Sequence, residues 1–143
     1  MLKSFRIHSE TVETTQRNQI VDVTERIAKF VRQRGVKDGM LIVYSPHTTA
    51  SVTINENYDP TVKSDMLQKL SKLVPHHETY YEHDEGNSDS HVKTAMVGNS
   101  ATILIQDGRL VLGRWQGIYF CEFDGPRTRE LMVKLLSFDP ASD

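Results

Sequence analysis

"SPHTTASVTINENYDP", residues 45–60, is the stretch of sequence from which the organisation of this chain can be worked out. In an extended strand successive side chains point to opposite faces, so Ala50, Val52 and Ile54 share one apolar face. The opposite face is a row of hydrogen-bonding side chains: His47, Thr49, Ser51, Thr53 and Asn55. The pattern predicts a strand that seals a core on one side and offers polar groups to a cleft on the other.

The segments around this strand predict three helices, at residues 22–34, 60–73 and 88–97. The first two have apolar residues at helical spacing, and the first should cover a sheet with its apolar face. Gly35 has the position of a left-handed residue that ends the first helix.

Residues of the capping classes mark the starts of these helices. Asp22 and Glu25 have the spacing of a capping box at the first helix. Asp59 is expected to cap the second helix, and Ser88 or Asp89 the third.

The rest of the chain predicts a largely antiparallel sheet, and therefore an α+β fold. Residues 2–8 predict an edge strand, and the apolar run at residues 40–45 predicts a central one. "DG" at residues 107–108 is a hairpin signal that leads into a long return strand at residues 109–124. A last strand is expected at residues 129–137.

Composition limits the class of protein. The 143 residues fit a single domain, 1–143, and carry 17 Lys plus Arg against 19 Asp plus Glu, which gives no broad basic surface for nucleic acid. No stretch approaches the ~20 apolar residues of a membrane helix, and the N-terminus lacks the apolar core of a signal peptide. We therefore expect a cytoplasmic protein with neither a nucleic-acid nor a membrane partner. The single cysteine, Cys121, fits a reducing compartment and is expected to be a small buried hydrophobe.

Three histidines lie on three separate predicted elements. His47 begins the polar row, His83 lies in the acidic loop at residues 75–89, and His91 lies on the first turn of the third helix. Three imidazoles that converge in this way can hold zinc and leave a position open for water. The alternative is that each histidine is separately hydrogen-bonded and structural.

Several charged residues suggest a cleft for a small phosphorylated ligand. Glu122 follows an apolar run and needs a cation, a metal or a donor, and Arg127 is a candidate partner or phosphate ligand. Lys93 lies near a helix start whose free N–H groups could bind phosphate. The sequence has no Walker loop, GxGxxG, GxSxG or CxxC motif, which disfavours the enzyme classes that use them.

The stretches "HTTASVTINEN" (47–57), "GNSDSHVK" (86–93) and "LVLGRWQGIYFCEFDGPR" (110–127) together resemble the YjbQ family, described as secondary thiamine-phosphate synthases. The resemblance extends from the first strand to about residue 134, with departures at Tyr58, Ser90 and Leu104. It implies a mixed, largely antiparallel sheet that is curved into a half-barrel and covered by helices, and a homotrimer. It also places the following residues at motif positions: His47, Asn55, Glu56, Asp59, His83, His91, Lys93, Gln116, Glu122, Asp124 and Arg127.

The reaction implied by the resemblance joins hydroxymethylpyrimidine pyrophosphate to thiazole phosphate and releases pyrophosphate. The divalent metal would be zinc on His47, His83 and His91, or magnesium brought by substrate phosphate. We expect Glu56, Glu122 and Asp124 to be catalytic. The expected substrate-binding residues are Thr49, Ser51, Asn55, Asp59, Lys93, Gln116 and Arg127.

Two other functions fit the same residues. The first is a non-enzymatic trimeric protein that binds a metal or a phosphorylated metabolite. The second is a metal-dependent hydrolase in which Glu56 or Glu122 is the base for a metal-bound water.

Overall fold

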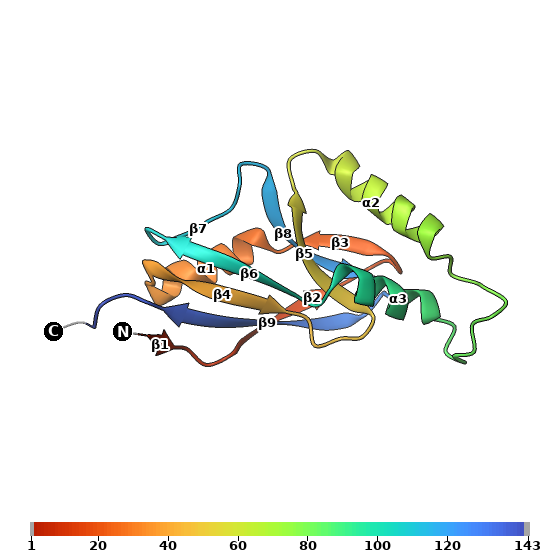
Figure 1. Cartoon of the computed structure of the whole chain (residues 1–143), viewed down its shortest axis with the longest axis horizontal. Helices are drawn as coiled ribbons and strands as arrows, with labels where there is room; N and C mark the ends of the chain where they lie inside the picture. The colour runs from red at the N-terminus through yellow and green to blue at the C-terminus, as the bar shows by residue number, and fades with distance from the viewer. Residues whose placement is uncertain (1, 142–143) are drawn as a thin grey trace.

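The computed structural model describes residues 2–141, and its strands form two antiparallel sheets (Figure 1). The larger, sheet A, has the strand order β1-β9-β4-β6-β7, and β2 also pairs with β9. The smaller, sheet B, has the order β3-β8-β5. The strands are β1 Lys3–Ser4, β2 His8–Glu13, β3 Gln19–Asp22, β4 Asp38–Tyr44, β5 Ala50–Glu56, β6 Ser100–Gln106, β7 Arg109–Leu110, β8 Gln116–Glu122 and β9 Thr128–Ser137.

Three helices complete the fold: α1 Thr24–Arg34, α2 Pro60–Leu73 and α3 Ser88–Val97. The main core lies between α1 and the inner faces of both sheets, and it includes Phe30, Leu41, Val52, Phe120 and Val133. Within residues 2–141, no helix has both the length and the apolar composition needed to cross a membrane.

A second apolar cluster covers the other face of sheet B. Tyr119, Cys121 and Phe123 on and after β8 pack there against residues of α2 and α3, among them Leu70 and Val97. Burial raises the pKa of the Cys121 thiol to about 12, so the thiol stays protonated, as expected for a buried hydrophobe. Sheet B is therefore covered on both faces.

This double cover corrects the interpretation of the opening stretch. The strand forms as predicted, but its polar row does not line one open cleft, because Thr49 and Ser51 in the middle of the row are buried while Asn55 near its far end is exposed. Ser51 is fully buried, and its hydroxyl donates to the carbonyl of Thr94 on α3 at 3.3 Å. His47 lies before the strand, in the loop between β4 and β5.

The predicted α+β class is confirmed, and the helices agree closely with the prediction. Gly35 ends α1 in the left-handed conformation, and Asp59 caps α2 by accepting the N–H of Thr61 at 2.9 Å. The strands form two sheets instead of one, and the half-barrel curvature stays a prediction.

The predicted capping box is wrong in part. Asp22 accepts the N–H of Thr24 at 2.9 Å, but Glu25 pairs with Arg32 at 2.7 Å instead of reaching back, and Val23 at the N-cap position makes no side-chain hydrogen bond. Helix α3 begins after Asn87, also without a side-chain cap. Asp89 does not cap the helix, because its carboxylate is paired with Arg17 and Lys93.

The predicted return strand is also wrong, because it is broken. The hairpin at Asp107 and Gly108 is confirmed by positive φ angles of 53° and 76°. The chain then leaves sheet A after β7 and enters sheet B as β8, so the segment between them, residues 111–115, crosses from one sheet to the other. The predicted edge strand at residues 2–8 is only the short β1.

Candidate functional site

A pocket of about 390 Å³ opens between the loop after β4 and helix α3. His47 and Thr48 from the loop line one side of it, and His91 and Thr94 from α3 line the other. We call this the histidine pocket. His83 lies next to it, with its ring centre 5.4 Å from that of His91 and the two rings nearly perpendicular.

Local hydrogen bonds bring the two sides of the pocket together. Where β4 ends, the N–H of Ser45 donates to the carbonyl of Asn99, and the hydroxyl of Ser45 donates to the carbonyl of Ala50, both at 2.8 Å. These bonds hold the 46–49 loop against the end of α3 and the start of β6. His47 and His91 therefore line the same pocket, although they come from different elements.

His47 is held from the other side by β9. The backbone N–H of Glu130 donates to its Nε2 at 2.9 Å. Burial and the positive charge of Arg129 lower the pKa of the imidazole, although Glu122 and Glu130 oppose this shift. His47 is therefore neutral at physiological pH.

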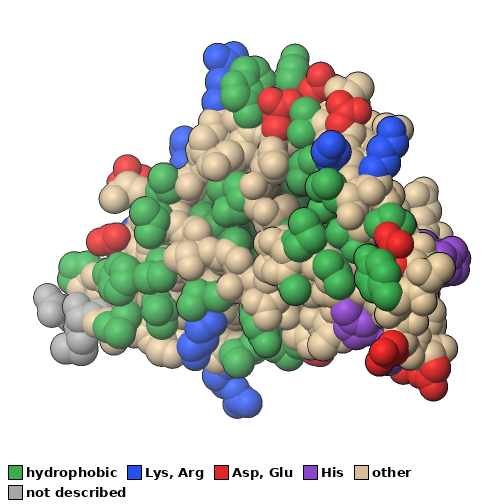
Figure 2. Space-filling model, turned by 45° about the vertical axis from the view of Figure 1, so that its right-hand side comes forward, with side chains coloured by type: hydrophobic (Ala, Val, Ile, Leu, Met, Phe, Trp, Pro, Cys, Tyr) green, Lys and Arg blue, Asp and Glu red, His purple; other side chains and the backbone are tan. Residues whose placement is uncertain are grey.

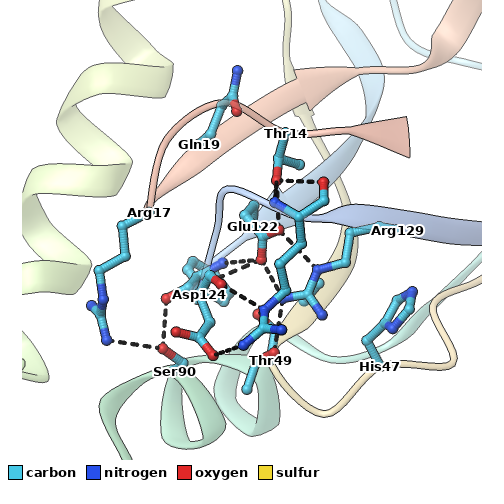
Figure 3. Close-up of polar contacts among 12 residues, drawn as sticks. Thr14, Arg17, Gln19, His47, Thr49, Ser90, Glu122, Asp124 and Arg129 are labelled. Carbon is cyan, nitrogen blue, oxygen red and sulfur yellow. Dashed lines mark hydrogen bonds and ion pairs between the residues drawn. The ribbon is translucent and has the colours of Figure 1, made fainter. Parts of the chain in front are cut away.

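A buried ion pair lies beside His47 (Figure 3). Glu122 is fully buried, and Arg129 binds both of its carboxylate oxygens through Nε and Nη2. Nη2 of Arg129 also donates to the hydroxyl of Thr49 at 2.8 Å, and the hydroxyl of Thr14 donates to Glu122 at 2.7 Å. These contacts leave Glu122 paired inside the protein and connect it to the loop that carries His47.

The partner predicted for Glu122 was wrong: Arg129, not Arg127, forms the pair. Arg129 shares the inward parity of Leu131 and Val133 on β9, and this signal in the sequence could have identified it. Arg127 is half exposed and binds Asp124 at 3.0 Å.

The carboxylate of Asp124 is also held by a buried amide. Nδ2 of Asn87 donates at 2.8 Å to Oδ2 of Asp124, the same oxygen that Arg127 binds. Asp124 is thus shared between the turn after β8 and the start of α3, so its position depends on both elements.

Lys93 is buried, and so it is not open to a phosphate. Its ammonium lies 3.2 Å from Asp89, and Arg17 binds the same carboxylate with two bonds of 2.9 and 3.0 Å. Burial alone would raise the pKa of Asp89, but the hydrogen bonds and charges of Arg17 and Lys93 outweigh it and hold that pKa below its usual value. No pattern in the sequence singled out Arg17 as a partner of Asp89.

The remaining candidate residues lie at the other end of sheet B. In the β5–β8 register Ala50 is opposite Glu122, while Glu56 is opposite Gln116. Six strand steps separate these two pairs, which is roughly 20 Å at ~3.3 Å per residue. The predicted residues at this far end are Asn55, Glu56, Asp59 and Gln116. Within one chain, therefore, the candidates form two separate groups.

Exposed aromatic side chains mark this far end. Tyr58 and Trp115 stack edge to face with ring centres 4.8 Å apart, and Arg114 lies 4.8 Å over the Trp115 ring. Tyr58 is 74% exposed and Trp115 43%. We call this pair the aromatic tip.

Metal binding can be tested against the histidine geometry. Among residues 2–141, no group of three or more His, Cys, Asp or Glu side chains is arranged to hold a metal. Two imidazoles on one tetrahedral zinc, each bound at ~2.0–2.1 Å, have ring centres roughly 5 Å apart. The ring centres of His83 and His91, 5.4 Å apart, have about this separation. His47 does not join them in this arrangement, because the Glu130 amide takes its Nε2.

The comparisons with known proteins agree on one family. The UPF0047 protein YjbQ-like family model matches residues 8–137. UPF0047 protein YugU of Bacillus subtilis is 45% identical over 136 residues, which cover 95% of this chain and 99% of that protein. UPF0047 protein MJ1081 of Methanocaldococcus jannaschii is 50% identical over 125 residues, 87% of this chain and 90% of that protein.

Solved structures show the same fold. A YjbQ/UPF0047 family protein from Clostridium acetobutylicum is 48% identical, with a TM-score of 0.87 over 90% of this chain and 98% of the other. A YbjQ-like protein from Sulfolobus solfataricus P2 is 26% identical, with a TM-score of 0.90 over 96% of this chain and 99% of the other. The chain belongs to the UPF0047 YjbQ-like family.

Proposed function

We propose that this chain binds a small phosphorylated metabolite in the histidine pocket and acts there as a secondary thiamine-phosphate synthase. The observation that carries the proposal is that His47 and His91 line one pocket, with His83 against His91. Its volume of about 390 Å³ is in the range of small-molecule sites. The reaction itself is the one implied by the resemblance of the three sequence stretches.

The chemistry makes two demands on the pocket. Departing pyrophosphate carries negative charge that donors or cations must stabilise, and the pyrimidine must be oriented toward the thiazole nitrogen. His83 and His91 would hold a divalent metal, which supplies charge stabilisation for phosphate oxygens when it is bound. The other lining groups would orient the ligand.

In this proposal Glu122 positions the site and does not touch the substrate. Its carboxylate is enclosed and fully hydrogen-bonded, so it cannot reach a ligand without breaking the pair with Arg129. Through Arg129 and Thr49 it holds the loop that carries His47. Lys93 has a similar buried role through Asp89.

We also propose that the chain forms a homotrimer. The outer face of sheet A exposes Ile42, Tyr44 and Leu104, and Figure 2 shows hydrophobic side chains gathered in patches on the surface. Such bare apolar faces mark interaction sites. In a closed ring the aromatic tip of one copy could lie against the next copy, which would bring Glu56 and Gln116 toward a neighbouring histidine pocket.

A turnover assay tests the proposed reaction. Wild-type protein is incubated with hydroxymethylpyrimidine pyrophosphate, thiazole phosphate and a divalent metal, and thiamine phosphate is measured. We expect the wild type to form thiamine phosphate, His91→Ala to form it more than about 100-fold more slowly, and His77→Ala to form it at nearly the wild-type rate. Removing a metal ligand should cost more than the 10–100-fold typical of changing a residue that only contacts a ligand. His77 is the control because it is an exposed histidine outside the pocket.

The same assay separates the alternative functions. Binding of pyrophosphate without product would favour the non-enzymatic binder. Release of phosphate from either substrate alone would favour the hydrolase. Equal product from wild type and His91→Ala would contradict the proposed site.

A further inference from the structure

A backbone amide of β9 fixes the ring of His47. The β4–β9 register ends at the pair of Tyr44 and Met132, so the amide of Glu130, two residues away, has no partner from β4. Its N–H donates instead to Nε2 of His47 at 2.9 Å. An N–H donor requires an unprotonated ring nitrogen, so neutral His47 carries its proton on Nδ1.

The orientation of this ring is also fixed by packing. His47 meets Phe120 edge to face, with ring centres 6.4 Å apart and planes at 89°. Phe120 belongs to the main core and is fully buried, so the His47 ring packs against the core. His47 therefore lines the pocket with a ring whose tautomer and plane are both set by neighbouring groups.

Thr94 contributes a second polar group to the same pocket. It is only 7% exposed, and its carbonyl accepts the N–H of Gly98 at 2.9 Å and the hydroxyl of Ser51 at 3.3 Å. Its own hydroxyl has no hydrogen-bond partner within residues 2–141. A buried hydroxyl without a partner is destabilising, and rotation of the Thr94 side chain toward the pocket would let a ligand satisfy it.

We infer that His47 is a fixed hydrogen-bond donor for an oxyanion in the histidine pocket, with its Nδ1–H and the Thr94 hydroxyl both bonding to a phosphoryl oxygen. This inference rests on the proposed function and refines it. The unprotonated nitrogen of His47 is engaged by Glu130, so His47 is not a metal ligand. His83 and His91 are left to bind the metal.

Histidine nitrogen spectra test the inference on the wild-type protein. The protein is labelled with nitrogen-15 histidine, and long-range proton–nitrogen correlations are recorded at about pH 7.5, above the reference histidine pKa. We expect the Nδ1–H tautomer for His47. Pyrophosphate should shift Nδ1 of His47, whereas zinc should leave this tautomer unchanged and shift His83 and His91. An Nε2–H tautomer, or a zinc-bound nitrogen on His47, would overturn the inference.

A pair of substitutions tests the position of the donor. In His47→Asn the side-chain amide nitrogen can occupy the place of Nδ1, and in His47→Gln it reaches the place of Nε2. We expect His47→Asn to keep pyrophosphate affinity within about threefold, while His47→Gln and His47→Ala lose about tenfold or more, as for a hydrogen bond to a charged group. Equal affinity in all variants, or a loss in His47→Asn as large as in His47→Ala, would overturn it.

The spectra also separate this inference from the proposed function. If pyrophosphate shifts no histidine signal, the proposed ligand is wrong. If it shifts His83 and His91 but leaves Nδ1 of His47 unchanged, only the role of His47 is wrong. His77 should show no shift in either case.

Discussion

The buried carboxylate of Asp89 shows how single side chains determine the fold beneath the pocket. Two cations, Arg17 and Lys93, bind it where the chain between β2 and β3 meets α3. A buried charge is tolerated only when it is paired, so each partner depends on the others. Glu122 and Arg129 are likewise buried charges that are tolerated because they are paired with each other.

The Asp89 network predicts loss of stability in acid. Its pKa is lowered in the folded protein, so its stabilisation is present above the unfolded pKa of about 3.9 and is lost as pH falls through the lower folded value. Asp89→Asn should lower the free energy of unfolding by about 3 kcal/mol at neutral pH and weaken its dependence on pH below about 4. Denaturant unfolding from neutral pH down to about pH 3 measures both. Parallel pH profiles for the two proteins would contradict this account.

Strand β4 owes its close pairing with β9 to a glycine. A Cβ added at Gly39 would lie 2.1 Å from the carbonyl oxygen of Leu136, a backbone atom that cannot move without disturbing β9. At Gly113 an added Cβ would meet only the flexible end of Gln116, at 3.3 Å.

We therefore expect Gly39→Ala to destabilise the protein by about 1–3 kcal/mol or more, since overpacking forces the backbone apart. Gly113→Ala, the matched control, should change stability by less than about 0.5 kcal/mol. Urea unfolding with an unchanged slope measures the difference. Similar midpoints for the two variants would show that β4 and β9 can separate without cost.

The sequence predicted the helices well because their signals are local. Gly35 and Asp59 act through their own neighbours, and so they could be read directly. β2 was missed because its residues, 8–13, are mostly polar and give no alternating apolar face. The break between β7 and β8 was missed because both segments are extended, and sequence alone does not show that they enter different sheets.

The candidate site was predicted in part for the same reason. His47 and His91 share a pocket as expected, and His83 lies beside it. The main partners of Lys93 and Glu122, which are Asp89 and Arg129, are near in sequence, but the further contacts from Asn18 and Thr14 come from distant segments that no local pattern reveals. Parity along a strand gives only the face of each side chain, whereas the rise of ~3.3 Å per residue already separates the two ends of β5.

At the scale of the whole molecule, the outer face of sheet A exposes apolar side chains that a second copy of the chain could cover. Ile42 and Tyr44 alternate with fully buried neighbours on β4, and Leu104 is 57% exposed on β6. The histidine pocket begins where β4 ends, so a copy packed on this face would lie beside the pocket.

Light scattering should give the wild-type protein a mass about three times the 16.3 kDa of the chain. Leu104→Glu should shift the mass toward a single chain because it buries an unpaired charge in the interface. The control is Lys69→Glu, at an exposed residue of α2 outside sheet A, and it should leave the mass unchanged. Thr102→Glu cannot serve as the control, because Thr102 lies on the same face of sheet A as Leu104. A wild-type protein that stays at 16.3 kDa at micromolar concentration would contradict the homotrimer.

The most direct test of the histidine pocket is a calorimetric titration of zinc into the wild-type protein, His91→Ala and His77→Ala. We expect one zinc per chain in the wild type and in His77→Ala. His91→Ala should lose more than the 10–100-fold in affinity typical of a change around the ligands, because it removes a ligand. If wild type and His91→Ala bind zinc with the same affinity, the histidine pocket is not the metal-binding site of this protein.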